Sequence, residues 1–270
     1  MIKQNLFIAI FVVVILLIGC NNPGQNQTEQ SQSMDSEMNG YPAAEGFNET
    51  ASDQEAIEVA NEVMESMGGY QNWVGTHYLS WNFFGARKHY WNKWTNDIRV
   101  ESLRDDLVIL MNIDSRNGKV QKNGEHLTNS DSVSKYLDMG WRWWVNDSYW
   151  LAMPFKLKDS GVTLKYLGED TTQSGDPAHK LQLTFAEVGH TPQNKYHVFV
   201  NKERDLVTQW SFFRSADQEE PNFTTPWEGY QEFGNILLAG GRGEREISEI
   251  MVSQDLPDMV FISFDEVALD

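Results

Sequence analysis

The sequence contains a single cysteine, and this scarcity excludes two kinds of chemistry. Cys20 has no partner for an internal disulfide, and no other thiol exists to act inside a folded core. Basic residues are also few, since 21 Lys and Arg stand against 39 Asp and Glu, for a formal net charge of −18. So acidic a chain is poorly suited to bind nucleic acid, or to dock on anionic headgroups through a basic patch.

The common motifs of enzymes are also missing. The chain has no G-x-S-x-G elbow, no P-loop and no dinucleotide-binding fingerprint. Its six histidines show neither an i,i+4 pair nor the spacing of metal ligands. The glycine-rich run of residues 240–243 lacks the strand-loop-helix setting of a phosphate cradle and indicates a turn. We therefore expect no metal site, no cofactor and no enzymatic activity.

The first 19 residues have the pattern of a secretory signal peptide. Lys3 is the only basic residue before the apolar run of residues 6–18, which is too short for a comfortable transmembrane helix. The ending Leu17-Ile18-Gly19-Cys20 resembles a bacterial lipobox. This resemblance implies cleavage before Cys20, a diacylglycerol thioether on its sulfur, and a fatty acid such as palmitate on the new amino terminus. Several acyl chains anchor firmly, because each buried CH₂ contributes about 0.8 kcal/mol.

Residues 20–50 are predicted to be the lipidated cysteine and a disordered tether. Gln, Asn, Ser, Glu and Gly dominate this stretch, and it contains no Lys or Arg. Asn21 and Asn22 follow the cysteine, where an Asp would favour retention in the inner membrane. We therefore expect an anchor in the outer membrane that faces the periplasm, with exposure at the cell surface left open.

Residues 51–270 are predicted to form one globular domain of the α+β class. Apolar residues recur at helical spacing over residues 52–67 and 130–144. Short turns connect most of the strands, a pattern that favours an antiparallel sheet. We expect a strongly curved half-barrel whose concave face is covered by the helices. The predicted strands are residues 79–83, 107–113, 162–167, 181–185, 196–200, 206–213, 247–252 and 260–264, with a hairpin turn at Asn117-Gly118.

The stretch from Gly140 to Gly168 is the most aromatic part of the chain. Four of the ten tryptophans lie within its first eleven residues. Such a cluster forms either a packed core or the wall of an apolar cleft. Polar candidates for the mouth of a cleft are Asn146, Asp147, Lys156, Lys158 and Asp159, although Asp147 and Asp159 also suit turns or helix caps. The residues that we predict to contact a ligand are Trp81, Trp91, Trp141, Trp144, Trp150, Met153 and Phe155.

Three segments of this stretch, and one later segment, carry a resemblance to a known family. Residues 144–150 (WVNDSYW), 153–159 (MPFKLKD), 161–166 (GVTLKY) and 191–196 (TPQNKY) resemble a family of uncharacterised Gram-negative envelope lipoproteins, over about residues 65–245. At greater remove, the order of lipobox, tether, helix and antiparallel meander is similar to the lipoprotein-localisation carrier fold. That resemblance implies a half-barrel closing over helices around an apolar cavity for acyl chains.

Three functions remain open on the sequence. The first is a lipid-anchored, non-enzymatic protein that holds a lipid or acyl chain in an aromatic cavity, as a carrier of lipid or lipoprotein would. The second is a module that binds a glycan or another envelope protein through exposed tryptophans. The third is a hydrolase that uses Asp147 or Asp159, which would require two carboxyl groups roughly 5–10 Å apart in one groove.

Overall fold

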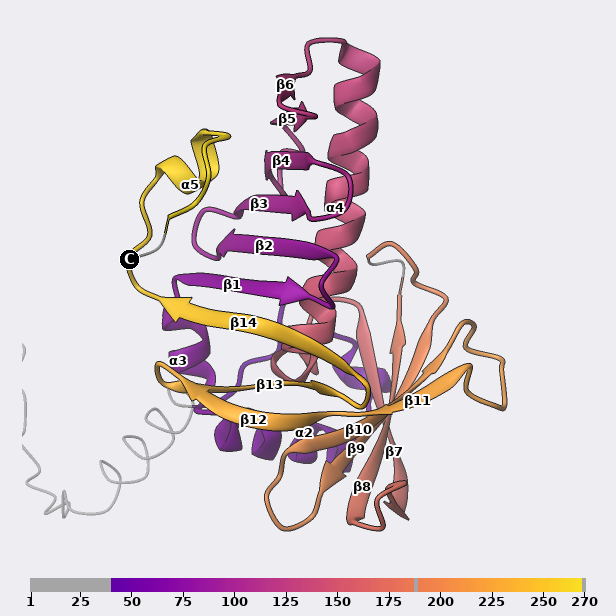
Figure 1. Ribbon diagram of the computed structural model, residues 1–270. Helices are drawn as coiled ribbons and strands as arrows, with labels where there is room; N and C mark the ends of the chain where they lie inside the picture. The colour runs from indigo at the N-terminus through magenta and orange to yellow at the C-terminus, as the bar shows by residue number, and fades with distance from the viewer. Residues whose placement is uncertain (1–39, 187–188, 269–270) are drawn as a thin grey trace, which may run out of the picture. The chain divides into compact units, whose positions relative to one another are not determined.

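The structure is a computed structural model that describes residues 40–186 and 189–268 (Figure 1). The predicted signal peptide, the lipidation site Cys20 and residues 21–39 lie outside the described residues. Two antiparallel sheets and a few helices make up the described part. Within it, no helix is both long enough and apolar enough to cross a bilayer.

Sheet A has nine strands in the order β12-β13-β14-β1-β2-β3-β4-β5-β6. Sequence neighbours pair in a meander from β1 to β6, and β14 then adds beside β1. The chain therefore begins and ends its strands within the same sheet. The strands are β1 Tyr78–Phe83, β2 Arg87–Asn92, β3 Asp97–Ser102, β4 Leu107–Asn112, β5 Gly118–Lys122, β6 Glu125–His126, β12 Glu228–Phe233, β13 Ile236–Arg242 and β14 Arg245–Ser253.

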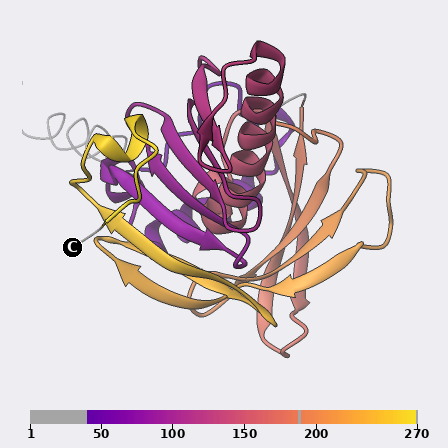
Figure 2. The same cartoon turned by 45° about the horizontal axis from the view of Figure 1, so that its top comes forward.

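Sheet B has five strands in the order β11-β10-β9-β8-β7, again all antiparallel. It lies beside the β12–β14 end of sheet A (Figure 2). One hydrophobic core unites side chains of both sheets with those of three α-helices and a 3₁₀ helix. The strands are β7 Val162–Thr171, β8 Pro177–Phe185, β9 Lys195–Asn201, β10 Val207–Phe213 and β11 Phe223–Pro226.

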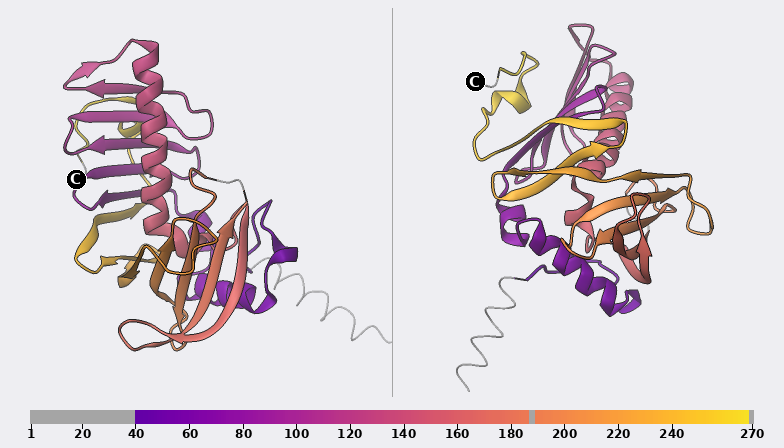
Figure 3. Two further views of the ribbon diagram at one scale, coloured as in Figure 1. Left: turned by 90° about the vertical axis from the view of Figure 1, so that its right-hand side faces the viewer. Right: turned by 60° about the horizontal axis from the view of Figure 1, so that its bottom comes forward.

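The long helix α4, Ser130–Ala152, crosses the strands of sheet A on one face (Figure 3). Asn129 caps its N-terminus, because the side-chain oxygen accepts a hydrogen bond from the Ser132 N–H. Gly140 lies against Ile109 of β4, where an added Cβ would come within 2.9 Å of that side chain. The missing side chain lets helix and sheet pack closely. The short 3₁₀ helix η2, Met153–Lys156, follows directly.

The remaining helices cover other surfaces. Helix α2, Gln54–Ser66, packs its apolar face against β7 and η2. Helix α3, Tyr70–Gly75, leads into β1, and the 3₁₀ helix η1, Glu49–Ala51, contacts β7. Helix α5, Met259–Ile262, lies on the face of sheet A opposite α4 (Figure 3).

The predicted α+β class with antiparallel strands is confirmed, whereas a single half-barrel is not. The strands divide between two sheets, and neither sheet is closed. Residues 260–264 were predicted as a strand, but residues 260–262 belong to helix α5 and the other two to no strand. The glycine-rich run of residues 240–243, predicted as a turn, belongs largely to β13. Gly240 and Gly241 are needed there because an added Cβ would meet Ile247 O at 2.4 Å or Glu228 Cγ at 2.7 Å.

The predicted tether ends earlier than composition indicated. Tyr41 donates its hydroxyl hydrogen to the carbonyl of Phe155 at 3.0 Å and accepts a hydrogen bond from the Lys158 N–H at 2.9 Å. Phe47 also packs against the core, and the Asn48 N–H donates to the Val162 carbonyl. These two aromatic residues supply the apolar area that the preceding polar stretch lacks. Residues 41–50 are therefore part of the fold.

Candidate functional site

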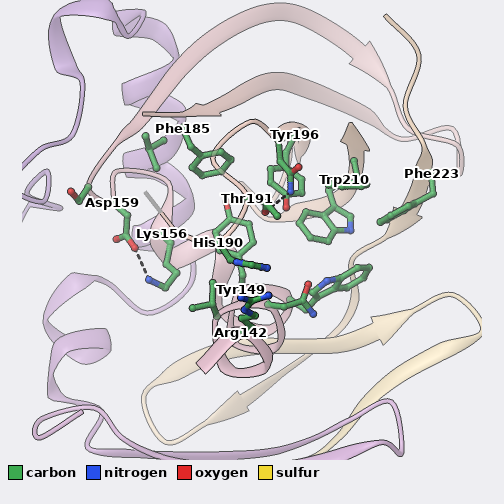
Figure 4. Close-up of a pocket in the computed structure, with 18 residues that line it drawn as sticks. Arg142, Tyr149, Lys156, Asp159, Phe185, His190, Thr191, Tyr196, Trp210 and Phe223 are labelled. Atoms are coloured by element: carbon green, nitrogen blue, oxygen red, sulfur yellow. Dashed lines mark hydrogen bonds and ion pairs between the residues drawn. The ribbon is translucent and has the colours of Figure 1, made fainter. Parts of the chain in front are cut away.

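A cavity of about 480 Å³ lies between the C-terminal half of α4 and sheet B (Figure 4). Helix α4 contributes one continuous face, because the lining residues recur at intervals of three and four positions. This volume is in the range of small-molecule sites in proteins. The lining residues of α4 are Arg142, Val145, Asn146, Tyr149 and Trp150.

Sheet B supplies the opposite wall from aligned positions on neighbouring strands. Phe223, Phe212 and Tyr196 lie directly opposite one another across β11, β10 and β9. Val162 of β7 lies opposite Phe185 of β8 in the same way. Residues that face each other across antiparallel strands point to one side of the sheet, so these side chains form a single apolar surface.

Aromatic contacts connect the two walls. Trp210 of β10 stacks on Tyr196 with ring centroids 4.9 Å apart and an interplanar angle of 3°. Trp150 of α4 meets Trp210 edge to face at 4.7 Å and stacks on Phe223 at 5.9 Å. These arrangements are the ones that aromatic quadrupoles favour. The aromatic rings of the two walls therefore pack against one another in specific orientations.

Tyr149 carries an unusual polar group into this apolar setting. Its ring contacts Phe185, Tyr196 and Trp210, yet its hydroxyl oxygen is buried and has no hydrogen-bond partner. Burial raises the pKa of Tyr149 well above its ordinary value, and it raises the pKa of Tyr196 to about 12. Both hydroxyls are therefore neutral at physiological pH and can serve only as hydrogen-bonding groups.

Charged and polar side chains gather toward the rim. Lys156 and Asp159 form an ion pair with 2.5 Å between Nζ and Oδ2. Arg142 pairs with Asp138 at 2.9 Å, and both side chains are about half exposed. His190 lies on the loop side of the cavity (Figure 4). The cavity thus combines an aromatic interior with a rim that carries both signs of charge.

A buried ionic network fastens α4 to sheet A. Asp147 accepts two hydrogen bonds from Arg87, at 2.6 Å from Nε and 2.9 Å from Nη2, and one from His89 Nε2 at 2.7 Å. The side chains of Asp147 and His89 are fully buried. Burial alone would raise the pKa of Asp147, but the hydrogen bonds from His89 and Arg87 outweigh it and hold that pKa below its ordinary value.

His89 completes the network as a neutral ring. Burial lowers its pKa against the opposing effect of Asp147, and its Nδ1 atom has no hydrogen-bond partner. The proton therefore belongs on Nε2, which donates to the carboxylate. Asp147 was considered as a turn, a rim group or a catalytic acid, but it lies inside α4 and does not line the cavity that contains Asp159.

Arg242 of β13 holds the C-terminal end of α4. The carbonyl of Trp150 would normally accept a hydrogen bond from residue 154, but Pro154 has no N–H. Arg242 Nη2 supplies the missing donor at 2.5 Å, while its guanidinium lies 3.5 Å from the Trp227 ring centroid. Burial lowers the pKa of Arg242 to about 9. This contact fixes the position of Trp150 in the cavity wall.

The residues predicted to contact a ligand fall into three groups. Trp150 lines the aromatic cavity, and Phe155 lines a second, smaller one. Trp81, Trp91 and Met153 are buried in the core. Trp141 and Trp144 pack partly buried against that core, with Trp144 edge-on to Trp91 at 5.2 Å.

Sequence reasoning missed the wall from sheet B. The residues of this wall lie 33 to 71 positions beyond the end of α4, and nothing local marks them as partners: Phe185, Tyr196, Trp210, Phe212 and Phe223. The signal that could have found them was the alternation of aromatics at positions 210 and 212 within one predicted strand.

No known protein-family model matches this sequence, and no curated protein gives a significant match. Among solved structures, the chain is similar to a DUF1329 family protein from Desulfovibrio piger, with 12% identity, a TM-score of 0.43, and coverage of 76% of this chain and 96% of that one. A LolA superfamily protein from Nitrosomonas europaea gives 12% identity, a TM-score of 0.38 and the same coverage. MucB in complex with MucA(peri) gives 12% identity and 0.24, covering 75% and 57%.

The names of the first two structures agree with the resemblances drawn from the sequence, one to an uncharacterised family and a more remote one to the carrier fold. Because the TM-scores are below 0.5, these likenesses give no information about function.

Proposed function

We propose that this protein is a lipid-anchored, non-enzymatic envelope protein that binds a lipid or acyl chain in the cavity between α4 and sheet B. The observation that carries the proposal is the cavity itself, walled on both sides by aromatic rings and bordered by charges. An apolar chain gains about 0.8 kcal/mol for each CH₂ that it buries there. Arg142 and Lys156 lie where a phosphate or carboxylate headgroup would remain near water.

The alternatives have less support. Of the ten tryptophans, all within the described residues, only Trp94 is exposed, so no flat row of indoles is available for a glycan. The hydrolase hypothesis required the carboxyl groups of Asp147 and Asp159 to face one groove. Asp159 lines the cavity, whereas Asp147 is buried and does not, so this hypothesis has less support. Anchoring through Cys20, an outer-membrane location and a carrier role are part of the proposal on the strength of the lipobox and the cavity.

The experiment fills the cavity from the helix side. Val145→Trp places an indole into the cavity, whereas Ser134→Trp adds the same ring to an exposed position on the same helix. We expect the parent and Ser134→Trp to bind a fluorescent long-chain fatty acid equally, and Val145→Trp to bind at least tenfold more weakly. Unchanged binding by Val145→Trp, with unfolding curves that show all three proteins folded, would place the ligand elsewhere.

A further inference from the structure

A second cavity of about 320 Å³ lies apart from α4, where the segment of residues 41–44 passes α3 and the turn between β2 and β3. Five aromatic residues supply most of its apolar wall. Trp73 stacks on Phe155 with centroids 4.3 Å apart, and Tyr41 stacks on Tyr70 at 5.9 Å. The fifth, Trp94, is 61% exposed and lies at the entrance, stacked on His77.

Lys93 brings a poorly solvated ammonium group to this cavity. Its Nζ lies 3.5 Å from the Trp73 ring centroid and donates a hydrogen bond to the Trp73 carbonyl. Burial, together with repulsion from nearby Lys156, lowers the pKa of Lys93 to about 7. When protonated, this group has three N–H donors. The Trp73 carbonyl accepts one of them, and the other two can bind another acceptor.

Lys158 is a second buried ammonium on the same cavity. The sequence left it as a rim or surface residue, but it is only 5% exposed. Its Nζ donates to the Tyr41 carbonyl and to Asn61 Oδ1, and lies 4.3 Å from the Tyr41 ring centroid. Burial also lowers the pKa of Lys158.

Neither ammonium forms an ion pair within the described residues, although Glu49 acts on Lys158 from a longer distance. The nine ion pairs of residues 40–186 and 189–268 include neither Lys93 nor Lys158. Asp159 borders the cavity, but Lys156 already engages it at 2.5 Å. Buried cations that lack an anion are costly, and carbonyl dipoles and ring faces repay only part of that cost. In a chain with 39 acids and 21 bases, leaving two cations unpaired in one cavity is unexpected.

We propose that this second cavity binds a small organic anion with a flat apolar body, such as an aromatic carboxylate. Its carboxylate lies between Lys93 and Lys158, and its ring stacks on the exposed Trp94, because Phe155 and Lys93 already cover the faces of Trp73. The anion supplies the charge that the fold leaves out, and charge-assisted hydrogen bonds of this kind are roughly twice as strong as neutral ones. The aromatic wall accounts for the flat body, because stacked rings gain beyond the area that they bury. This site does not depend on the ligand of the larger cavity.

The test uses the full chain in lipid nanodiscs, titrated calorimetrically with naphthoate, with empty nanodiscs as the blank. Naphthylmethanol serves as the uncharged probe of the same shape. Lys93→Met removes the ammonium but keeps the apolar stem, and Lys119→Met removes an exposed cation on β5. We expect Lys93→Met to bind naphthoate about tenfold or more weakly, Lys119→Met to bind it as the parent does, and naphthylmethanol to bind weakly to all three.

Two further variants keep the test decisive. Trp94→Ala alters an exposed ring and so leaves the fold intact, and it should weaken naphthoate binding even if Lys93→Met fails to fold. Val145→Trp fills only the larger cavity and should leave naphthoate binding unchanged. The proposal is overturned if the parent does not bind millimolar naphthoate, if the alcohol binds as tightly as the acid, or if Val145→Trp abolishes binding while Trp94→Ala does not.

Discussion

Replacing Asp147 with alanine would remove the acid that fastens α4 to sheet A. Three hydrogen bonds from Arg87 and His89 would be lost. His89 is fully buried and the Arg87 side chain is 18% exposed, so neither can recover its hydration without movement of the helix. Breaking a buried ion pair from one side typically costs 3–5 kcal/mol, of which the higher helix propensity of alanine returns about 0.5 kcal/mol.

Urea unfolding at neutral pH measures this cost, with Asp159→Ala as the matched control. Asp159 is also an acid in an ion pair, but its side chain is 40% exposed, so its loss should cost no more than about 1 kcal/mol. The combination of Arg87→Met, His89→Leu and Asp147→Leu should recover most of the loss, because apolar groups of similar volume can replace a buried network. If Asp147→Ala costs no more than Asp159→Ala, Asp147 does not hold the helix and must have another role.

The same network predicts an effect of acid on stability. The pKa of buried His89 lies below 6.5 in the folded protein, so below pH 6.5 the unfolded chain takes up a proton that the folded one does not. Stability should therefore fall as the pH drops below 6.5, by at most about 1.4 kcal/mol per pH unit. The lowered pKa of Asp147 adds a second loss only below pH 3.8, its ordinary value. Burial also lowers the pKa of His197 to about 4, so that residue contributes to the same phase. His89→Gln should therefore reduce the slope between pH 7 and 5 without abolishing it, and an unchanged slope would contradict the assignment.

Three further predictions concern other parts of the chain. Cys20→Ala should abolish labelling by an alkyne fatty acid, and a labelled variant would show the lipobox interpretation to be wrong. Deleting residues 21–39 should leave the free energy of unfolding nearly unchanged, whereas Tyr41→Ala should lower it by about 1–3 kcal/mol. If the deletion destabilises the protein as much as Tyr41→Ala does, the tether does not end near residue 40. Pro154→Ala should be more favourable by about 1 kcal/mol in an Arg242→Met background than in the parent, because it restores the N–H that Arg242 replaces. Additive effects in that double-mutant cycle would refute the capping role.

Local sequence patterns were sufficient for much of the fold. The 3.6-residue period predicted α2 and the first part of α4, and alternation predicted β1, β4, β14 and the strands of sheet B except β11. The pattern failed at β2, because its Arg87 and His89 are polar residues that face a buried acid 60 and 58 positions away. Helix α4 likewise continues through the Trp-rich block to Ala152, because Asp147 is neutralised by the sheet rather than by water.

The cavity was only half predictable for a related reason. The tryptophan block pointed to α4, but tryptophans 141 and 144 pack against the core, whereas residues 142, 145, 146, 149 and 150 face the cavity. Residues of both helix faces alternate along the sequence. Which of them line the cavity depends on which sheet each face contacts, and the local sequence does not show this. The composition of residues 20–50 also failed to show that Tyr41 and Phe47 pack against the core, because two aromatic residues hardly change the mean hydropathy of this polar stretch.

Native mass spectrometry of the protein purified from its own envelope tests the central claim most directly. We predict that the parent and Ser134→Trp carry a co-purifying lipid or acyl chain beyond the anchor at Cys20, and that Val145→Trp, with its cavity filled, does not. A parent protein whose mass shows only the chain and its anchor would contradict a lipid-binding cavity between α4 and sheet B. A Val145→Trp variant that retains as much ligand as the parent would contradict it as well.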